Sequence, residues 1–105
     1  MRSTIISILV LFTIFQLQAQ QSLNMNLMSS YSYSSNLSDV WGYATDQGEY
    51  ALVGLYGGIS ILDVTNPNSP SEIGYFEGPS SIWRDLKTYG DYVYCINETG
   101  GGLQI

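Results

Sequence analysis

The chain has 105 residues with nine acidic side chains, three basic ones and no histidine, which gives a formal net charge of −6 at pH 7. This excess of carboxylates argues against nucleic acid and anionic membrane surfaces as partners, because binding them requires clusters of lysine and arginine. The lack of histidine removes the commonest general base and zinc ligand, and with them hydrolytic triads and histidine-bound zinc within these residues.

Residues 1–19 have the three zones of a secretory signal peptide: the positive charge of Arg2, an apolar core at residues 5–15, and a polar stretch that ends at the small residue Ala19. The apolar core is well short of the roughly 20 residues that a transmembrane helix needs. We therefore predict cleavage after Ala19, export to the extracellular space or cell surface, and no stable membrane span after cleavage. An uncleaved anchor is the alternative, because Leu17 stands where a small residue is preferred.

The segment that follows, residues 20–37, is rich in Ser, Asn, Gln and Tyr and has no clear period of 2 or 3.6. This composition predicts an irregular polar leader or, alternatively, an edge strand around residues 27–33.

Beyond Ser38, short apolar runs separated by Gly, Pro, Asn and Asp are typical of β-strands and tight turns. We expect the pair Gly57-Gly58 to adopt the positive φ that tight hairpins demand. A loop at residues 65–70 contains two prolines, which cannot donate to a β-ladder. The four antiparallel strands predicted from this pattern are residues 40–45, 49–55, 59–64 and 72–76.

The pattern then begins again. Trp41, Gly48 and Tyr50 recur 42 residues later as Trp83, Gly90 and Tyr92. After an insertion of two residues, Gly57-Gly58 and Ile61 recur 44 residues later as Gly101-Gly102 and Ile105. A period of about 40 to 45 residues with four strands per unit is the signature of a β-propeller blade.

We therefore predict an all-β fold made of β-propeller blades of four antiparallel strands. Residues 38–105 would hold one complete blade and part of a second, preceded by the signal peptide. The final run, residues 100–105, resembles the start of a strand, so we expect the propeller repeats to be truncated at the C-terminus. A β-sandwich is the alternative fold.

Several stretches carry a family resemblance, and they cover most of residues 38–105. They are Ser38–Tyr43, Glu49–Gly54, Gly58–Pro67, Ser81–Tyr89 and Gly100–Ile105. In these stretches the chain resembles the LVIVD-type β-propeller repeats of bacterial secreted and surface proteins, particularly the choice-of-anchor B family. The resemblance implies an extracytoplasmic propeller that C-terminal sorting signals attach to the cell surface or release. No such tail is present, so we expect an N-terminal fragment whose mode of anchoring stays open.

Calcium is the one metal for which the chain offers candidate ligands, because residues 63–68 and 39–46 are rich in oxygen donors. Their spacing does not match an EF-hand loop. Asp63 is expected instead to bond to the backbone of the turn ahead of it. We assign no catalytic, cofactor-binding or metal-binding residue and no cofactor.

Basic charge gathers only at Arg84 and Lys87, which flank Asp85. Adjacent residues on a strand point to opposite faces, so Arg84 and Asp85 are not expected to pair with each other. We predict an ion pair between Arg84 and another blade, and the alternative is a ligand contact of Arg84 in a central channel. The single cysteine, Cys95, is expected to be a buried small hydrophobe.

Aromatic residues recur at blade spacing, which favours packing between blades over a sugar-stacking platform. They are Trp41, Tyr43, Tyr50, Trp83, Tyr92 and Tyr94. From these observations we expect a non-enzymatic secreted or cell-surface β-propeller that acts as an interaction scaffold for an extracellular protein or glycan. The alternative is the N-terminal part of an exported propeller enzyme whose catalytic residues lie beyond residue 105.

Overall fold

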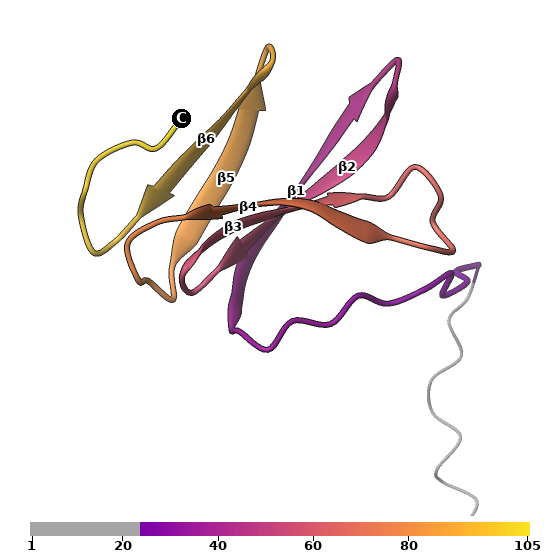
Figure 1. Ribbon diagram of the computed structural model, residues 1–105, viewed down its shortest axis with the longest axis horizontal. Coiled ribbons are helices and arrows are strands. Elements are labelled where there is room, and N and C mark those ends of the chain that lie inside the picture. Colours follow the sequence, from indigo (N-terminus) through magenta and orange to yellow (C-terminus); the bar gives the residue numbers. More distant parts are fainter. Residues whose placement is uncertain (1–23) are drawn as a thin grey trace, which may run out of the picture.

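The computed structural model describes residues 24–105, and the predicted signal peptide at 1–19 lies outside them. Within the described range the chain is all-β and contains no helix, so it has none long and apolar enough to cross a membrane. Its strands form one antiparallel sheet of four and one of two, which are compatible with partial propeller blades (Figure 1). The strands are β1 (Leu37–Thr45), β2 (Gly48–Leu55), β3 (Gly58–Asp63), β4 (Ser71–Glu77), β5 (Arg84–Tyr89) and β6 (Tyr92–Asn97).

The first sheet has the strand order β1-β2-β3-β4, so each strand pairs with its neighbour in sequence. The central strands β2 and β3 are buried along most of their length because both faces of the sheet are covered. The edge strand β4 is largely exposed. The four predicted strands are present, with boundaries that differ from the prediction by at most three residues.

One expectation about the turns is wrong, since neither Gly57 nor Gly58 has a positive φ. Gly58 is required for another reason: a Cβ atom there would collide with the backbone carbonyl of Phe76 on the neighbouring strand. Positive φ occurs instead in the second hairpin, at Gly90 (φ 57°), the first residue of the β5–β6 turn. Glycine therefore has two different roles: it allows close approach of a neighbouring strand at Gly58, and it allows a positive φ at Gly90.

The second sheet repeats the first hairpin at a spacing of 44 residues. Thr45 pairs with Gly48 across the first turn, and Tyr89 pairs with Tyr92 across the second. The identity-based alignment at 42 residues is therefore wrong for the hairpins: Gly48 opens β2, whereas Gly90 lies in a turn. Turn geometry sets the register of a hairpin, and here it overrides the sequence identities.

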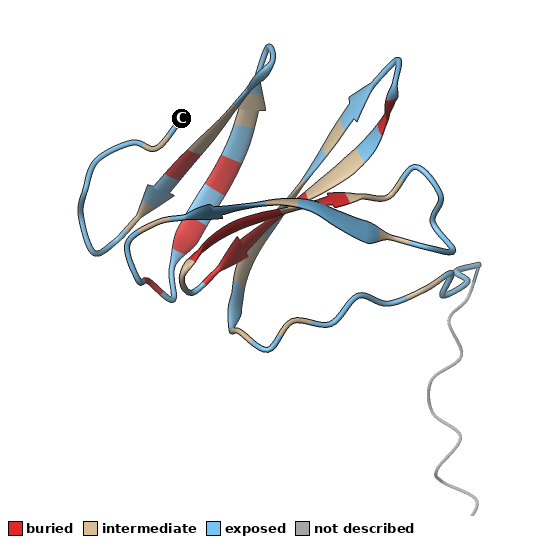
Figure 2. Ribbon diagram, in the orientation of Figure 1, coloured by how far each residue is buried: buried red, intermediate tan, exposed pale blue. Residues whose placement is uncertain are grey.

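The two sheets pack face to face. Leu52 and Ile59 of the first sheet meet Leu86 and Cys95 of the second in one buried cluster. Leu86 and Cys95 are 0% and 1% exposed, so Cys95 is the buried hydrophobe that the sequence predicts. Figure 2 shows buried segments on β2 and β3 and on the facing pair β5 and β6.

The leader runs without regular strand structure along the opposite face of the first sheet, so residues 27–33 form no edge strand. Tyr33 packs against a second buried cluster of Val53, Leu55 and Leu62. Its hydroxyl donates to Ser60 Oγ at 2.8 Å, and Ser60 Oγ donates to Glu72 Oε1 at 2.9 Å. Burial raises the pKa of Tyr33 above its ordinary value. The leader therefore contacts the sheet through both apolar packing and hydrogen bonds.

Candidate functional site

Arg84 is the most heavily engaged polar side chain at the junction of the two sheets. It is 5% exposed and reaches from the start of β5 to the end of β2. Its Nε donates to the carbonyl oxygen of Leu55 at 2.7 Å, and its second terminal nitrogen donates to the carbonyl oxygens of Tyr56 and Pro79. The predicted ion pair to a carboxylate is therefore wrong. Arg84 joins the sheets through backbone carbonyls, a set of acceptors that suits the fixed fork of a guanidinium.

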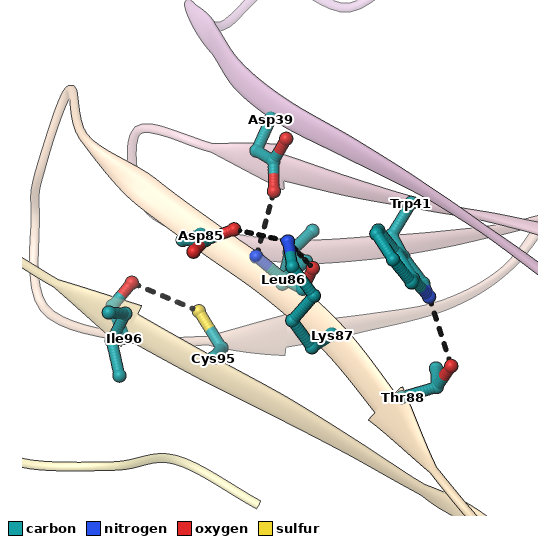
Figure 3. Close-up of polar contacts among 8 residues, drawn as sticks. All are labelled: Asp39, Trp41, Asp85, Leu86, Lys87, Thr88, Cys95 and Ile96. Atoms are coloured by element: carbon teal, nitrogen blue, oxygen red, sulfur yellow. Dashed lines mark hydrogen bonds and ion pairs between the residues drawn. The ribbon is translucent and has the colours of Figure 1, made fainter.

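Asp39 forms a second link between the sheets. Its Oδ2 accepts a hydrogen bond at 2.7 Å from the backbone N–H of Leu86 (Figure 3). Leu86 is opposite Cys95, whose own N–H and C=O bond to Gln104 on the other side, so the two residues are a non-hydrogen-bonded pair. The N–H of Leu86 therefore points away from β6 and has no ladder partner in its own sheet. The carboxylate of Asp39 satisfies a backbone donor that would otherwise be buried without a partner. The Asp39 carboxylate therefore has a structural role.

Trp41 contacts the second sheet with both its ring and its nitrogen. The indole Nε1–H donates to Thr88 Oγ1 at 2.9 Å, and Lys87 Nζ lies 4.4 Å from the ring centroid (Figure 3). The ring also packs against the buried cluster between the sheets. For Trp41 the packing interpretation is confirmed.

Lys87 and Asp85 form an exposed ion pair of 2.7 Å on β5, and the ammonium of the same lysine lies beside the Trp41 ring. As expected, Asp85 does not pair with Arg84, because alternation places the two side chains on opposite faces. The hydrogen bond from Lys87 lowers the pKa of the Asp85 carboxyl below its ordinary value.

Four tyrosines lie at one end of the two sheets, where the β1–β2 and β5–β6 turns are found (Figure 1). Tyr43 and Tyr50 face each other across the first hairpin, with ring centroids 6.4 Å apart. Tyr89 and Tyr92 face each other across the second and are 80% and 62% exposed. The Tyr43 hydroxyl donates to the Gly90 carbonyl oxygen at 3.2 Å and thereby joins the two hairpins. We call this surface the tyrosine end.

The aromatic residues that were predicted to pack between blades differ in their exposure. Tyr43 and Tyr50 are partly buried, as packing between blades predicts, whereas Tyr92 is exposed and Trp83 is 61% exposed just before β5. Tyr94 is partly buried in β6. Sequence reasoning missed Tyr89, because its counterpart 44 residues earlier is Thr45 and no aromatic recurrence marks the position.

In the oxygen-rich loop after β3, side-chain oxygens accept hydrogen bonds from backbone N–H groups of the same loop. Asp63 Oδ1 accepts from the backbone N–H of Thr65 at 2.9 Å, and Asn66 Oδ1 accepts from the N–H of Asn68 at 3.2 Å. Hydrogen bonds from Thr65 lower the pKa of the Asp63 carboxyl. The turn-forming interpretation of Asp63 is confirmed. No group of three or more acidic, cysteine or histidine side chains that could hold a metal ion occurs between residues 24 and 105.

Residues 42–77 match a known family model, the LVIVD repeat. The match begins inside β1 and ends with β4, so it covers the end of β1 and all of β2, β3 and β4. These residues form a repeat of the LVIVD type. The repeat fits a β-propeller repeat family, as does the hairpin that recurs in the second sheet. No curated protein and no solved structure matches the chain.

Proposed function

We propose that the chain is part of an exported β-propeller that acts as a binding scaffold for an extracellular protein or glycan, without catalysis by the residues present. The observation that carries the proposal is the LVIVD repeat at residues 42–77, which folds as one sheet and stacks on a second. Fold alone does not set function, so the binding role rests on the surface that the two sheets present.

The tyrosine end is the proposed contact surface. Tyrosine offers a large apolar face and a hydroxyl tip with few rotatable bonds, which makes it common in binding surfaces. Tyr89 and Tyr92 are exposed and lie directly opposite each other on the β5–β6 strand pair. Loops and turns on a rigid scaffold are the usual position for recognition residues.

Export is proposed from the signal-peptide pattern of residues 1–19, with cleavage after Ala19. The similarity to the choice-of-anchor B family makes cell-surface attachment or release part of the same proposal. Fractionation of cells that express the full chain, with mass analysis of the N-terminus, tests it. A new N-terminus at Gln20 in the extracytoplasmic fraction supports export, and an intact Met1 in the cytosol contradicts it.

The binding role is tested on a panel of immobilised purified glycans and extracellular proteins. We expect the full chain to bind a member of the panel, and the double variant Tyr89→Ala/Tyr92→Ala to lose at least about tenfold in affinity, as central aromatic contacts do. The control is Tyr75→Ala, because Tyr75 is 47% exposed but lies on β4 and belongs to neither the β1–β2 nor the β5–β6 hairpin. No binding across the panel, or equal loss in both variants, would contradict the assignment. Chemical conversion of a bound glycan by this chain would contradict the proposal that the residues present do not catalyse a reaction.

A further inference from the structure

The leader covers one face of the first sheet, and the repeat shows what that face corresponds to. Gly42 pairs with Ala51 in the first hairpin, and 44 residues later Leu86 pairs with Cys95 in the second. Leu86 and Cys95 lie on the face that packs against the first sheet. Ala51 packs, together with Tyr33 of the leader, against the buried cluster on the other face of the first sheet. The leader therefore holds the position on the first sheet that the first sheet itself holds on the second.

Side chains attach the leader to the first sheet at separate points. Near its C-terminal end, the ring of Tyr33 packs on the sheet and its hydroxyl donates to Ser60 Oγ at 2.8 Å. Four residues earlier, Ser29 Oγ donates to the carbonyl oxygen of Pro67 at 2.6 Å. The second of these attachments is exposed, so the polar contact there competes with water and contributes little to stability.

Between these points the leader stands away from the sheet. A hollow of about 690 Å³ lies between residues 26–31 and the sheet face, where Val40 and Val64 belong to its wall. Leu27 and Met28 are 88% and 53% exposed, so these apolar side chains of the leader are not buried against the sheet. A segment with few buried apolar contacts opens locally at a low cost in free energy.

The junction between the two sheets has a tighter construction. Its buried cluster consists of side chains that are at most 6% exposed, namely Leu52, Ile59, Leu86 and Cys95. Arg84 and Asp39 add hydrogen bonds across the same junction. Opening of the junction should therefore cost more free energy than opening of the leader.

We propose that the leader is a strap that replaces a neighbouring sheet on the first sheet and opens without separation of the two sheets. When the strap is closed, it shields the cluster of Val53, Leu55 and Leu62 from water and from other apolar surfaces. When it opens, it uncovers a face equivalent to the one through which the second sheet stacks on the first. This inference does not depend on the binding role of the tyrosine end, which lies at the hairpin turns.

Thiol labelling of the full chain tests whether the strap opens by itself. Val53 is 7% exposed beneath the leader, so Val53→Cys places a thiol there, and the native Cys95, 1% exposed between the sheets, is the internal reference. Each labelling rate is measured by peptide mass mapping with an alkylating reagent and is divided by the rate in the unfolded chain. We expect the introduced thiol to react at least about tenfold faster than Cys95 and well below the unfolded rate. Equal rates at the two thiols, or an introduced thiol that reacts at the unfolded rate, would overturn the proposal. If Val53→Cys disturbs the fold, Ala51→Cys on the same face gives the same measurement.

A second substitution in the Val53→Cys chain tests the attachment at Tyr33. Tyr33→Phe removes the hydroxyl that donates to Ser60 and keeps the ring, so we expect labelling of the introduced thiol to rise about three- to tenfold while that of Cys95 stays unchanged. The matched control is Tyr31→Phe, because the Tyr31 hydroxyl makes only a long, exposed hydrogen bond of 3.4 Å to Glu72. We expect the control to change labelling less than about twofold. Equal effects of the two substitutions, or an equal rise at Cys95, would contradict a strap held by Tyr33.

Discussion

The two sheets use the same hairpin in different surroundings. In the first sheet, Leu52 on β2 is 1% exposed because the second sheet covers it; its counterpart 44 residues later on β6, Ile96, is 51% exposed. The first sheet is covered on one face by the second sheet and on the other by the leader. Within residues 24–105, the second sheet is covered on the face that meets the first sheet. Burial in this architecture is thus set by the neighbouring unit, as expected for repeats that bury their apolar faces by stacking.

The largest effect should come from the cluster that both sheets share. Leu86→Ala removes a side chain that is 0% exposed and leaves a cavity between the sheets, so we expect the free energy of unfolding to fall by about 2 to 5 kcal/mol. The matched control is Ile96→Ala on the uncovered face of the same sheet, where we expect less than about 1 kcal/mol. Chemical denaturation of both variants measures the difference, and equal losses would contradict the stacking.

Arg84 should come next. Arg84→Met keeps much of the side-chain volume but leaves the carbonyl oxygens of Leu55, Tyr56 and Pro79 without this donor. We expect a loss of about 1 to 3 kcal/mol in the free energy of unfolding, the usual cost of buried polar groups left unpaired. Lys87→Met removes an exposed ion pair and the contact of the ammonium with the Trp41 ring, and we expect a smaller loss of about 1 kcal/mol, since both kinds of contact are weak at exposed sites. A larger loss for Lys87→Met than for Arg84→Met would show that the order is wrong.

A smaller effect is expected at the tryptophans. Trp41→Phe removes the indole N–H that donates to Thr88 while it keeps an aromatic ring, so we expect about 0.5 to 1.5 kcal/mol of destabilisation. Trp83→Phe should be close to neutral because Trp83 is 61% exposed. Thermal unfolding of the pair measures this contrast between two residues that the sequence pattern treats as equivalent.

The smallest effect concerns pH and the loop after β3. Because the folded state lowers the pKa of Asp63 below its ordinary value of 3.8, Asp63 stabilises the fold above that value, and the contribution disappears as pH falls through the lowered pKa. We expect Asp63→Asn to flatten the acid side of the stability profile between pH 2 and about 5 relative to the unchanged chain. Denaturation at a series of pH values measures it, and identical profiles would contradict the role of the Thr65 hydrogen bonds.

Much of the first sheet could be predicted from sequence because its apolar alternation and turn residues are local signals. Packing of Trp41 followed from its recurrence as Trp83, yet the same reasoning missed the exposure of Trp83, since exposure depends on whether another unit covers it. The hydrogen-bond partners of Arg84 could not be predicted from the sequence, because they are backbone carbonyl oxygens and every residue type carries one. The path of the leader could not be predicted from the sequence either, because Tyr33 contacts residues that are distant along the chain.

The second sheet packs on the first, and its hairpin repeats the first one at a spacing of 44 residues. The Leu86 amide reports on this packing most directly, because it donates to Asp39 of the first sheet and not to a strand of its own sheet. Native-state hydrogen exchange of the full chain should show this amide protected to a degree similar to the amides of β2. Asp39→Ala should remove the protection at Leu86 and leave β2 unaffected. Rapid exchange of the Leu86 amide in a chain whose β2 amides are protected would contradict the account.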